Sequence, residues 1–313
     1  MTLVEPSASR VRLGIIVAFV SAIVFGVYPV AARAVYADGG NAVFLILATT
    51  AARALSLAFF CVLKKKHLFA TRDAVQQAFI GGAFQATSIL GIFMALSWMS
   101  GPLVVVIVFT NTLMLLFFMM WRGEIKIDAL TIILTALALF GLSLILDVWF
   151  QPQSVSLLGM MCAGIAAVAT ASRLYVYGRL MRTRDPAIVG AEAFLCAFLF
   201  GLLVLAFKAP QLPVSLAGYG WAAVSAGALA VGTFGMFYGI ALLGSFRFSL
   251  VTKLEPMFTA LFSVVLIHEA LEIRQYLGMV ILVGSLAAYQ YVMNRPRKGD
   301  LSEKCSVTWQ KMN

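Results

Sequence analysis

Residues 244–269 read GSFRFSLVTKLEPMFTALFSVVLIHE and contain one long apolar block, residues 248–267. An α-helix of about 20 residues extends about 30 Å, the thickness of the hydrocarbon core of a membrane. Lys253, Glu255 and Pro256 interrupt the block. Two of these residues carry a charge that hydrocarbon disfavours, and the proline removes a backbone hydrogen bond. The stretch therefore predicts a membrane-crossing helix with a kink at Pro256.

Nine further apolar blocks of similar length lie along the chain: residues 13–36, 42–63, 74–96, 102–121, 129–148, 157–180, 188–207, 219–243 and 275–293. Over the whole chain, 62% of residues are apolar, 12% are charged and the mean hydropathy is +0.97. A soluble domain carries about twice that charged fraction. The blocks are too long and too uniformly apolar for membrane strands, and helices satisfy every backbone group internally. The sequence predicts an all-α polytopic membrane protein of ten transmembrane helices.

The basic residues indicate the topology of this bundle. If the N-terminus lies inside, 17 of the 23 lysines and arginines fall in inner segments, and only Lys208 and Arg274 fall in outer ones. Inner loops of membrane proteins carry such an excess. We therefore expect both termini in the cytoplasm of a cell bounded by a plasma membrane, in bacteria the inner membrane. The formal charge of +10 is then a topology signal and not a nucleic-acid footprint.

The two halves of the chain resemble each other. Asn111 precedes Glu124 by 13 positions, and Pro256 precedes Glu269 by the same number, with an apolar helix following each glutamate. The fourth and fifth blocks thus match the ninth and tenth. Because five is an odd number, the second repeat enters the membrane upside down, as in many transporters. We expect the first repeat at 13–148 and the second at 157–293, between a cytoplasmic N-terminal segment (1–12) and a cytoplasmic tail (294–313).

The segment Leu254-Glu255-Pro256, followed by His268-Glu269, by Gln275-Tyr276-Leu277-Gly278 and by Gly284, resembles the C-terminal half of the drug/metabolite transporter superfamily in its ten-helix EamA-type branch. Arg53 resembles the arginine of that branch's second helix. The resemblance implies two inverted five-helix bundles, efflux of metabolites and no cofactor, and the layout is most similar to the amino-acid exporters. The chain departs from the pattern at Asn111, where the family has proline. Helix one also has no acidic residue, unlike the four-helix small multidrug members of the same superfamily, whose proton coupling depends on a membrane glutamate.

Polar and charged residues inside the blocks are the candidates for a central cavity, because each must face protein or water. They are Tyr28, Arg53, Gln85, Ser88, Asn111, Tyr175, Thr233, Tyr238, Lys253 and Glu255. The same groups could instead join helices through hydrogen bonds, and Arg53 could pair with Glu192 or Glu255. Pro29 and Pro256 are candidate hinges, with a structural kink as the alternative. Arg173 is interpreted as an interfacial anchor, and Glu124 and Glu269 as caps of the helices that follow them.

Together these features predict a transporter that exports amino acids by alternating access, with broad specificity and with facilitated or weakly coupled movement. The expected partners are the small-molecule substrate and the lipid bilayer; nucleic acid and an obligatory protein partner are not expected. The alternatives are a proton-coupled exporter of other metabolites or organic cations and, in another class, an intramembrane enzyme or a channel. No clustered acids or histidines suggest an enzyme, and no cysteine or histidine spacing suggests a metal site or disulfide framework.

Overall fold

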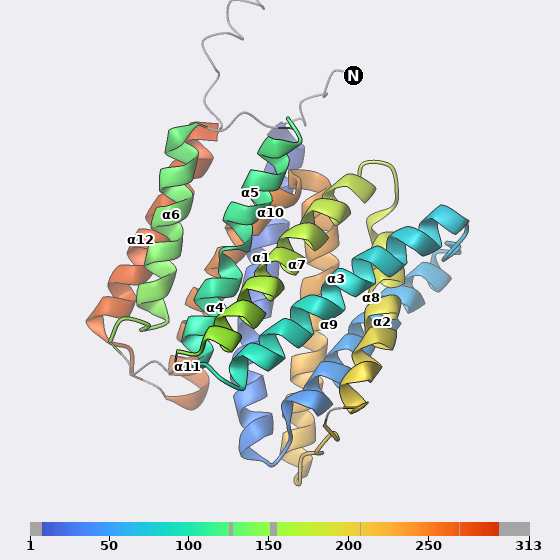
Figure 1. The fold of residues 1–313 in the computed structure, drawn as a ribbon, viewed down its shortest axis with the longest axis horizontal. Helices are drawn as coiled ribbons and strands as arrows, with labels where there is room; N and C mark the ends of the chain where they lie inside the picture. Colours follow the sequence, from blue (N-terminus) through green and yellow to red (C-terminus); the bar gives the residue numbers. More distant parts are fainter. Residues whose placement is uncertain (1–7, 125–127, 151–154, 207, 269, 294–313) are drawn as a thin grey trace, which may run out of the picture.

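The computed structural model describes residues 8–124, 128–150, 155–206, 208–268 and 270–293. Within these residues the chain is helical and contains no strand, as predicted (Figure 1). The first half comprises α1 (Ala8–Ala37), α2 (Ala42–Leu63), α3 (Arg72–Leu96), α4 (Gly101–Phe109), α5 (Asn111–Trp121) and α6 (Ala129–Ile145). The second half comprises α7 (Leu157–Leu180), α8 (Pro186–Gly201), η1 (Leu202–Ala206), α9 (Leu216–Leu243), α10 (Ser245–Val251), η2 (Thr252–Leu254), α11 (Glu255–Ile267) and α12 (Ile273–Met293).

The described chain is all-α, which confirms the predicted fold class, and its elements group into ten helical segments, five in each half of the chain, as two five-helix repeats require. Eight segments are long and apolar enough to cross a membrane by length and composition, and among them α4 with α5, and α10 to α11, each make one segment. The remaining two are the shorter apolar helix α6 and the 21-residue helix α12. Large apolar side chains such as Leu55, Phe59 and Val280 point outward, as a lipid environment requires.

The two proline positions behave differently. Pro29 lies inside α1, a helix of 30 residues that continues past the proline to Ala37. Pro256 occupies the first turn of α11, and a 3₁₀ turn at η2 separates this helix from α10. Proline fits a first helical turn because its missing N–H would have no intrahelical partner there. In place of the predicted kink at Pro256, the helical segment therefore changes from α to 3₁₀ geometry for the three residues of η2, and a hinge at either proline stays a prediction.

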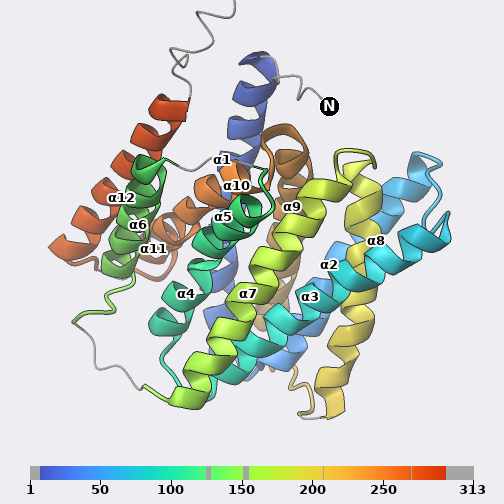
Figure 2. The ribbon, with the colours of Figure 1, turned by 45° about the horizontal axis from the view of Figure 1, so that its top comes forward.

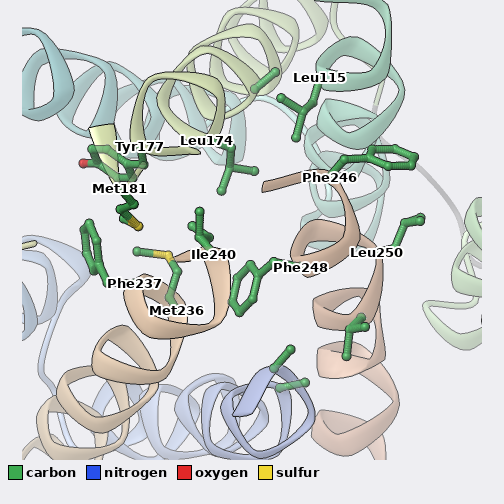
Figure 3. Packing of buried hydrophobic residues seen from close by; sticks show 14 of the residues in the cluster. Leu115, Leu174, Tyr177, Met181, Met236, Phe237, Ile240, Phe246, Phe248 and Leu250 are labelled. Atoms are coloured by element: carbon green, nitrogen blue, oxygen red, sulfur yellow. The ribbon is translucent and has the colours of Figure 1, made fainter. Parts of the chain in front are cut away.

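The helices pack in pairs that the repeats relate. α6 and α12, the fifth membrane-crossing segments of the two repeats, lie side by side at one end of the bundle (Figures 1 and 2). A Cβ atom on Gly141 would lie 2.8 Å from the carbonyl oxygen of Gly278, so only glycine permits this approach. At the other end of the bundle, α2 and α3 pack against α8. The largest apolar cluster fills the space between, around Leu115, Tyr177 and Phe237 (Figure 3).

Loop contacts define two faces of the bundle. We call the face at which α1 begins the N-terminal face; there Lys66 contacts Asp185 and Glu124 contacts Arg182. On the opposite face, where α1 ends, Asp38 accepts a hydrogen bond from the Ser215 N–H. Each of these contacts joins the first repeat to the second, so inter-repeat contacts are present at both ends of the bundle.

Candidate functional site

The two interrupted membrane segments meet inside the bundle. The first interruption lies at Thr110, between α4 and α5, and the second at η2. Lys253 of η2 donates a hydrogen bond from Nζ to Oδ1 of Asn111 at 3.0 Å, and both side chains are buried. Thr112 also donates to Asn111 Oδ1, at 3.1 Å, and its hydroxyl lies 2.7 Å from that of Ser249 in α10. Asn111 and Thr112 of the first repeat and Ser249 and Lys253 of the second thus form a buried polar cluster between the repeats.

Lys253 is the charge at the centre of this cluster. Its side chain is 3% exposed, and Nζ lies 4.1 Å from the ring centroid of Phe109. Glu255 interacts with it electrostatically, but no carboxylate among the described residues lies within 4.0 Å of the ammonium. A buried cation needs an anionic or hydrogen-bonding partner, and an ammonium has three donors. Asn111 satisfies one of them, which leaves capacity for a further oxygen ligand.

Arg173 of α7 and Arg53 of α2 form a second charged group. Arg173 donates from Nη1 to Oε1 of Gln85 at 2.6 Å and also faces Met236, while its Nε has no partner in the described part of the chain. Arg53 donates from Nε to the carbonyl of Thr49, and its guanidinium stacks 4.9 Å from the ring centroid of Phe194. Arg53 interacts electrostatically with Tyr28 and Arg173. This interior is therefore positively charged and includes two arginines.

Tyr28 and Glu255 connect the two groups. Tyr28 of α1 interacts electrostatically with both Arg53 and Glu255. Helix α1 approaches α11 closely, since a Cβ atom on Gly26 would lie 3.1 Å from the Glu255 carbonyl oxygen. The structure thus brings together six of the predicted cavity residues: Tyr28, Arg53, Gln85, Asn111, Lys253 and Glu255. Ser88 lies one helical turn beyond Gln85 on α3 and hydrogen bonds to Thr170 of α7 at 2.7 Å.

The other three candidates lie elsewhere. Tyr175 donates from its hydroxyl to Glu124 at 2.7 Å, near the N-terminal face. Tyr238 interacts electrostatically with Asp185 and Lys66, close to the same face. Thr233 is buried and donates to the Leu229 carbonyl of its own helix.

Three interpretations of charged residues are corrected. Arg173 is not an interfacial anchor, because its guanidinium points inward to Gln85. It precedes Arg179 by six residues, about 9 Å along a helix, and this spacing could have separated its role from that of Arg179. Glu192 does not pair with Arg53; it accepts hydrogen bonds from Arg184 and from the Phe69 N–H.

Glu124 also differs from its predicted role. It does not cap α6 but accepts hydrogen bonds from Tyr175 and Arg182, both reached from α7 or the loop after it. Glu269, the other predicted cap, lies outside the described residues. Thr112 and Ser249 were missed as site residues because each reads as an ordinary hydroxyl on an apolar helix.

Apolar side chains separate the central cluster from the N-terminal face. Leu115 lies four residues nearer that face than Asn111, and Phe248 and Phe246 lie five and seven residues nearer it than Lys253. Figure 3 shows these three side chains in one apolar cluster with Leu174 and Ile240, and we call the five residues the apolar layer. A cavity of about 130 Å³ opens beyond this layer, lined by Glu124, Tyr175, Arg179, Arg182 and neighbours. The N-terminal face therefore has a polar vestibule with an apolar floor.

Charged contacts join the two repeats at the N-terminal face. Lys66 Nζ lies 2.6 Å from Asp185 Oδ2, and this hydrogen bond raises the pKa of Lys66 above its ordinary value. Beneath this pair Glu192 is fully buried, 2.6 Å from Arg184 Nη2 and 2.7 Å from the Phe69 nitrogen. The loop between α2 and α3 is thereby fixed to α8.

The long apolar helices, the repeated five-helix unit and the buried charges within the spans together define an integral membrane protein with a polar interior. A family model confirms this class: the EamA-like transporter family matches residues 12–147 and 157–289, so the chain belongs to that family. It is accordingly a membrane transporter of small molecules. No curated protein matches the chain.

The fold is also similar to that of solved structures. One, titled "Crystal structure of protein", superposes with a TM-score of 0.74 at 15% sequence identity, over 90% of this chain and 99% of the other. At this identity the likeness concerns the fold alone.

Proposed function

We propose that the protein exports amino acids of several kinds through a central site between the two repeats. The observation that carries the proposal is the buried Lys253 ammonium, which meets Asn111 where both interrupted segments cross and has no described carboxylate in ion-pair range. The carboxylate of an amino acid would supply the missing anion. An interrupted helix at the membrane midplane, with free backbone groups, is where inverted-repeat transporters bind their substrates.

The other parts of an amino acid also find partners. Glu255 and the Tyr28 hydroxyl can accept hydrogen bonds from an ammonium group, and they interact with each other. Phe109 and Phe194 offer apolar surfaces for side chains of different sizes. Few polar groups select among side chains, which supports broad specificity. Arg53 and Arg173 reinforce the preference for a carboxylate, because uncompensated positive charge attracts anions.

We propose alternating access as the mechanism, with the N-terminal face in the cytoplasm. The repeats give two related arrangements around one site. The orientation rests on the excess of lysine and arginine in segments on that face, and it places both termini in the cytoplasm and the chain in a plasma membrane, in bacteria the inner membrane. With few carboxylates in the spans, movement is facilitated or weakly coupled, and it needs no cofactor.

One observation favours a second candidate, a proton-coupled exporter of other metabolites. Glu255 is a carboxylate within a span and has Tyr28 and Lys253 as electrostatic neighbours, so it could bind and release a proton during transport. Organic cations suit this interior less well, since Arg53, Arg173 and Lys253 would repel them.

Uptake by the purified protein in liposomes tests these proposals. A panel of radiolabelled amino acids is offered without and with a pH gradient, and Lys253→Met is compared with Lys64→Met, a change of an exposed lysine in the loop after α2. Saturable uptake of several amino acids without a gradient, lost in Lys253→Met and kept in Lys64→Met, is expected. Uptake only with a gradient would favour proton coupling, and no amino-acid uptake by folded protein would reject the substrate class.

A further inference from the structure

Asp185 performs two tasks on the N-terminal face. It is the N-cap of α8, and its Oδ1 accepts a hydrogen bond from the Ala187 N–H at 2.9 Å. Its other oxygen, Oδ2, receives Lys66 Nζ at 2.6 Å. Lys66 belongs to the loop 64–71 between α2 and α3. One side chain therefore starts a helix of the second repeat and holds a loop of the first.

Asn41 performs the same two tasks on the opposite face. It is the N-cap of α2, and its Oδ1 accepts a hydrogen bond from the Phe44 N–H at 3.0 Å. Its Nδ2 donates to the Ala209 carbonyl at 2.9 Å. Ala209 belongs to the loop 208–215 that leads into α9. This side chain starts a helix of the first repeat and holds a loop of the second.

The two arrangements are related by the inverted repeat. α2 and α8 begin the second membrane-crossing segment of their repeats, and the loops 64–71 and 208–215 each lead from the second segment to the third. In both cases the N-cap of one repeat reaches the second-to-third loop of the other. Because the repeats are inverted, the contacts lie on opposite faces. We name them the N-terminal latch (Asp185 with Lys66) and the opposite latch (Asn41 with Ala209).

Each latch has support from its surroundings. On the N-terminal face, Lys65 and Phe69 of the loop have φ angles of 52° and 53°, in the left-handed region that residues other than glycine seldom adopt, and Glu192 holds the Phe69 N–H. On the opposite face, Asp38 accepts from the Ser215 N–H at 2.8 Å, and the Asn41 N–H donates to the Gln211 carbonyl. Both loops are thus fixed to the other repeat, one mainly by charges and the other mainly by neutral groups.

We propose that Asp185 and Asn41 are the latches of two gates that open in turn, one at each face of the transporter. This inference rests on the alternating access of the proposed function. Since each latch joins the two repeats, a tilt of one repeat against the other breaks one latch and tightens its counterpart. Weakening one latch then shifts the population of conformations and changes access at both faces, in opposite directions.

The chain offers matched variants that break a latch and keep the helix cap. In Asp185→Asn, the side-chain oxygen still caps α8, but the ion pair with Lys66 is lost. In Asn41→Asp, an oxygen still caps α2, but a carboxylate replaces the amide that donates to Ala209. Lys66→Met and Asp38→Ala form a second pair that leaves both caps intact: the first removes the partner of Asp185, and the second removes the acceptor of the Ser215 N–H that supports the opposite latch. Lys64→Met and Gln211→Ala change exposed side chains of the same two loops and are the controls.

Cysteine alkylation reports on each gate. Cys61 is fully buried behind the N-terminal latch, where the Lys66 N–H donates to its carbonyl. It becomes the only cysteine when Cys162, Cys196 and Cys305 are replaced by alanine. Val35, fully buried at the end of α1 beside Gly40, becomes the opposite reporter as Val35→Cys in a protein without other cysteines. The rate of reaction with N-ethylmaleimide is measured in liposomes.

We expect Asp185→Asn to raise the alkylation rate of Cys61 about two- to fivefold, the range for a lost exposed ion pair, and to lower that of Val35→Cys. Asn41→Asp should raise the Val35→Cys rate about fivefold, the factor for one lost hydrogen bond, and lower that of Cys61. A change confined to the near face, or no change in either pair of variants, would overturn the proposal. The measurement uses no substrate, so reciprocal rates would support the latches even if amino-acid uptake failed.

Discussion

Lys253 and Asn111 lie 142 positions apart in the chain, and their side chains meet at 3.0 Å where the two repeats cross. Asn111 directly follows the interruption at Thr110, Lys253 lies within η2, and neither side chain is exposed. Their contact makes the stability of the bundle depend on a charge that we also propose for substrate binding. The first prediction separates these two roles.

Asn111→Ala should destabilise the protein by about 1–3 kcal/mol, because it leaves a buried ammonium with fewer hydrogen-bond acceptors. Asn111→Leu combined with Lys253→Met should recover most of this loss, since an apolar pair of similar shape can replace a buried polar one. Thermal unfolding in detergent measures the loss of stability and its recovery. Uptake in liposomes then measures whether the double variant still transports. Recovery of uptake by the double variant would contradict the role of Lys253 in transport.

Gly278→Ala should destabilise the pair of α6 and α12. The new Cβ would lie 2.6 Å from the Gly141 carbonyl oxygen, and backbone cannot yield as a flexible side chain can. Overpacking of this kind costs about 1–3 kcal/mol. Gly284→Ala in the same helix is the control, because a Cβ there meets no atom within 4 Å. Equal melting temperatures for the two variants would show that the close approach is unnecessary.

The ten helices could be predicted from sequence because hydrocarbon demands long apolar segments with internal hydrogen bonds. The interruption at η2 carries the signal of Pro256, whereas the one at Thr110 has no proline and was not predicted. Arg173 was misplaced because its neighbour Arg179 suggested an interface. The latches could not be predicted, since whether Asn41 reaches Ala209 depends on how two loops meet in space, which no local pattern encodes.

Glu192→Gln should destabilise the N-terminal face by about 1.5–3 kcal/mol, the range for a hydrogen bond to a charged group. The amide can still accept from the Phe69 N–H but gives Arg184 no countercharge. Adding Arg184→Met should restore part of the stability. Glu272→Gln, on an exposed side chain with only a long contact to Arg274, should change the melting temperature little. A melting temperature unchanged in Glu192→Gln would mean that this buried pair does not stabilise the face.

The opposite face should weaken in acid. The Ser215 N–H, which donates to Asp38, holds the pKa of that carboxyl below its ordinary value of 3.8. A carboxyl with a lowered pKa stabilises the folded state fully above its ordinary pKa, and this contribution is lost as the pH falls through the lowered value. Asp38→Asn should therefore flatten the fall of melting temperature below about pH 4. An identical acid profile in wild type and variant would rule out a contribution from Asp38.

The most direct measurement for the central site is competition between an amino acid and its carboxamide for uptake of the labelled acid. The amide keeps the ammonium and the side chain but lacks the anion proposed to meet Lys253. In the wild type the acid should compete at least about tenfold better than the amide, which corresponds to about 1.4 kcal/mol. In Lys253→Arg the preference should persist, and in Lys253→Met it should disappear. Equal competition by acid and amide in the wild type, or an unchanged preference in Lys253→Met, would contradict a carboxylate site at Lys253.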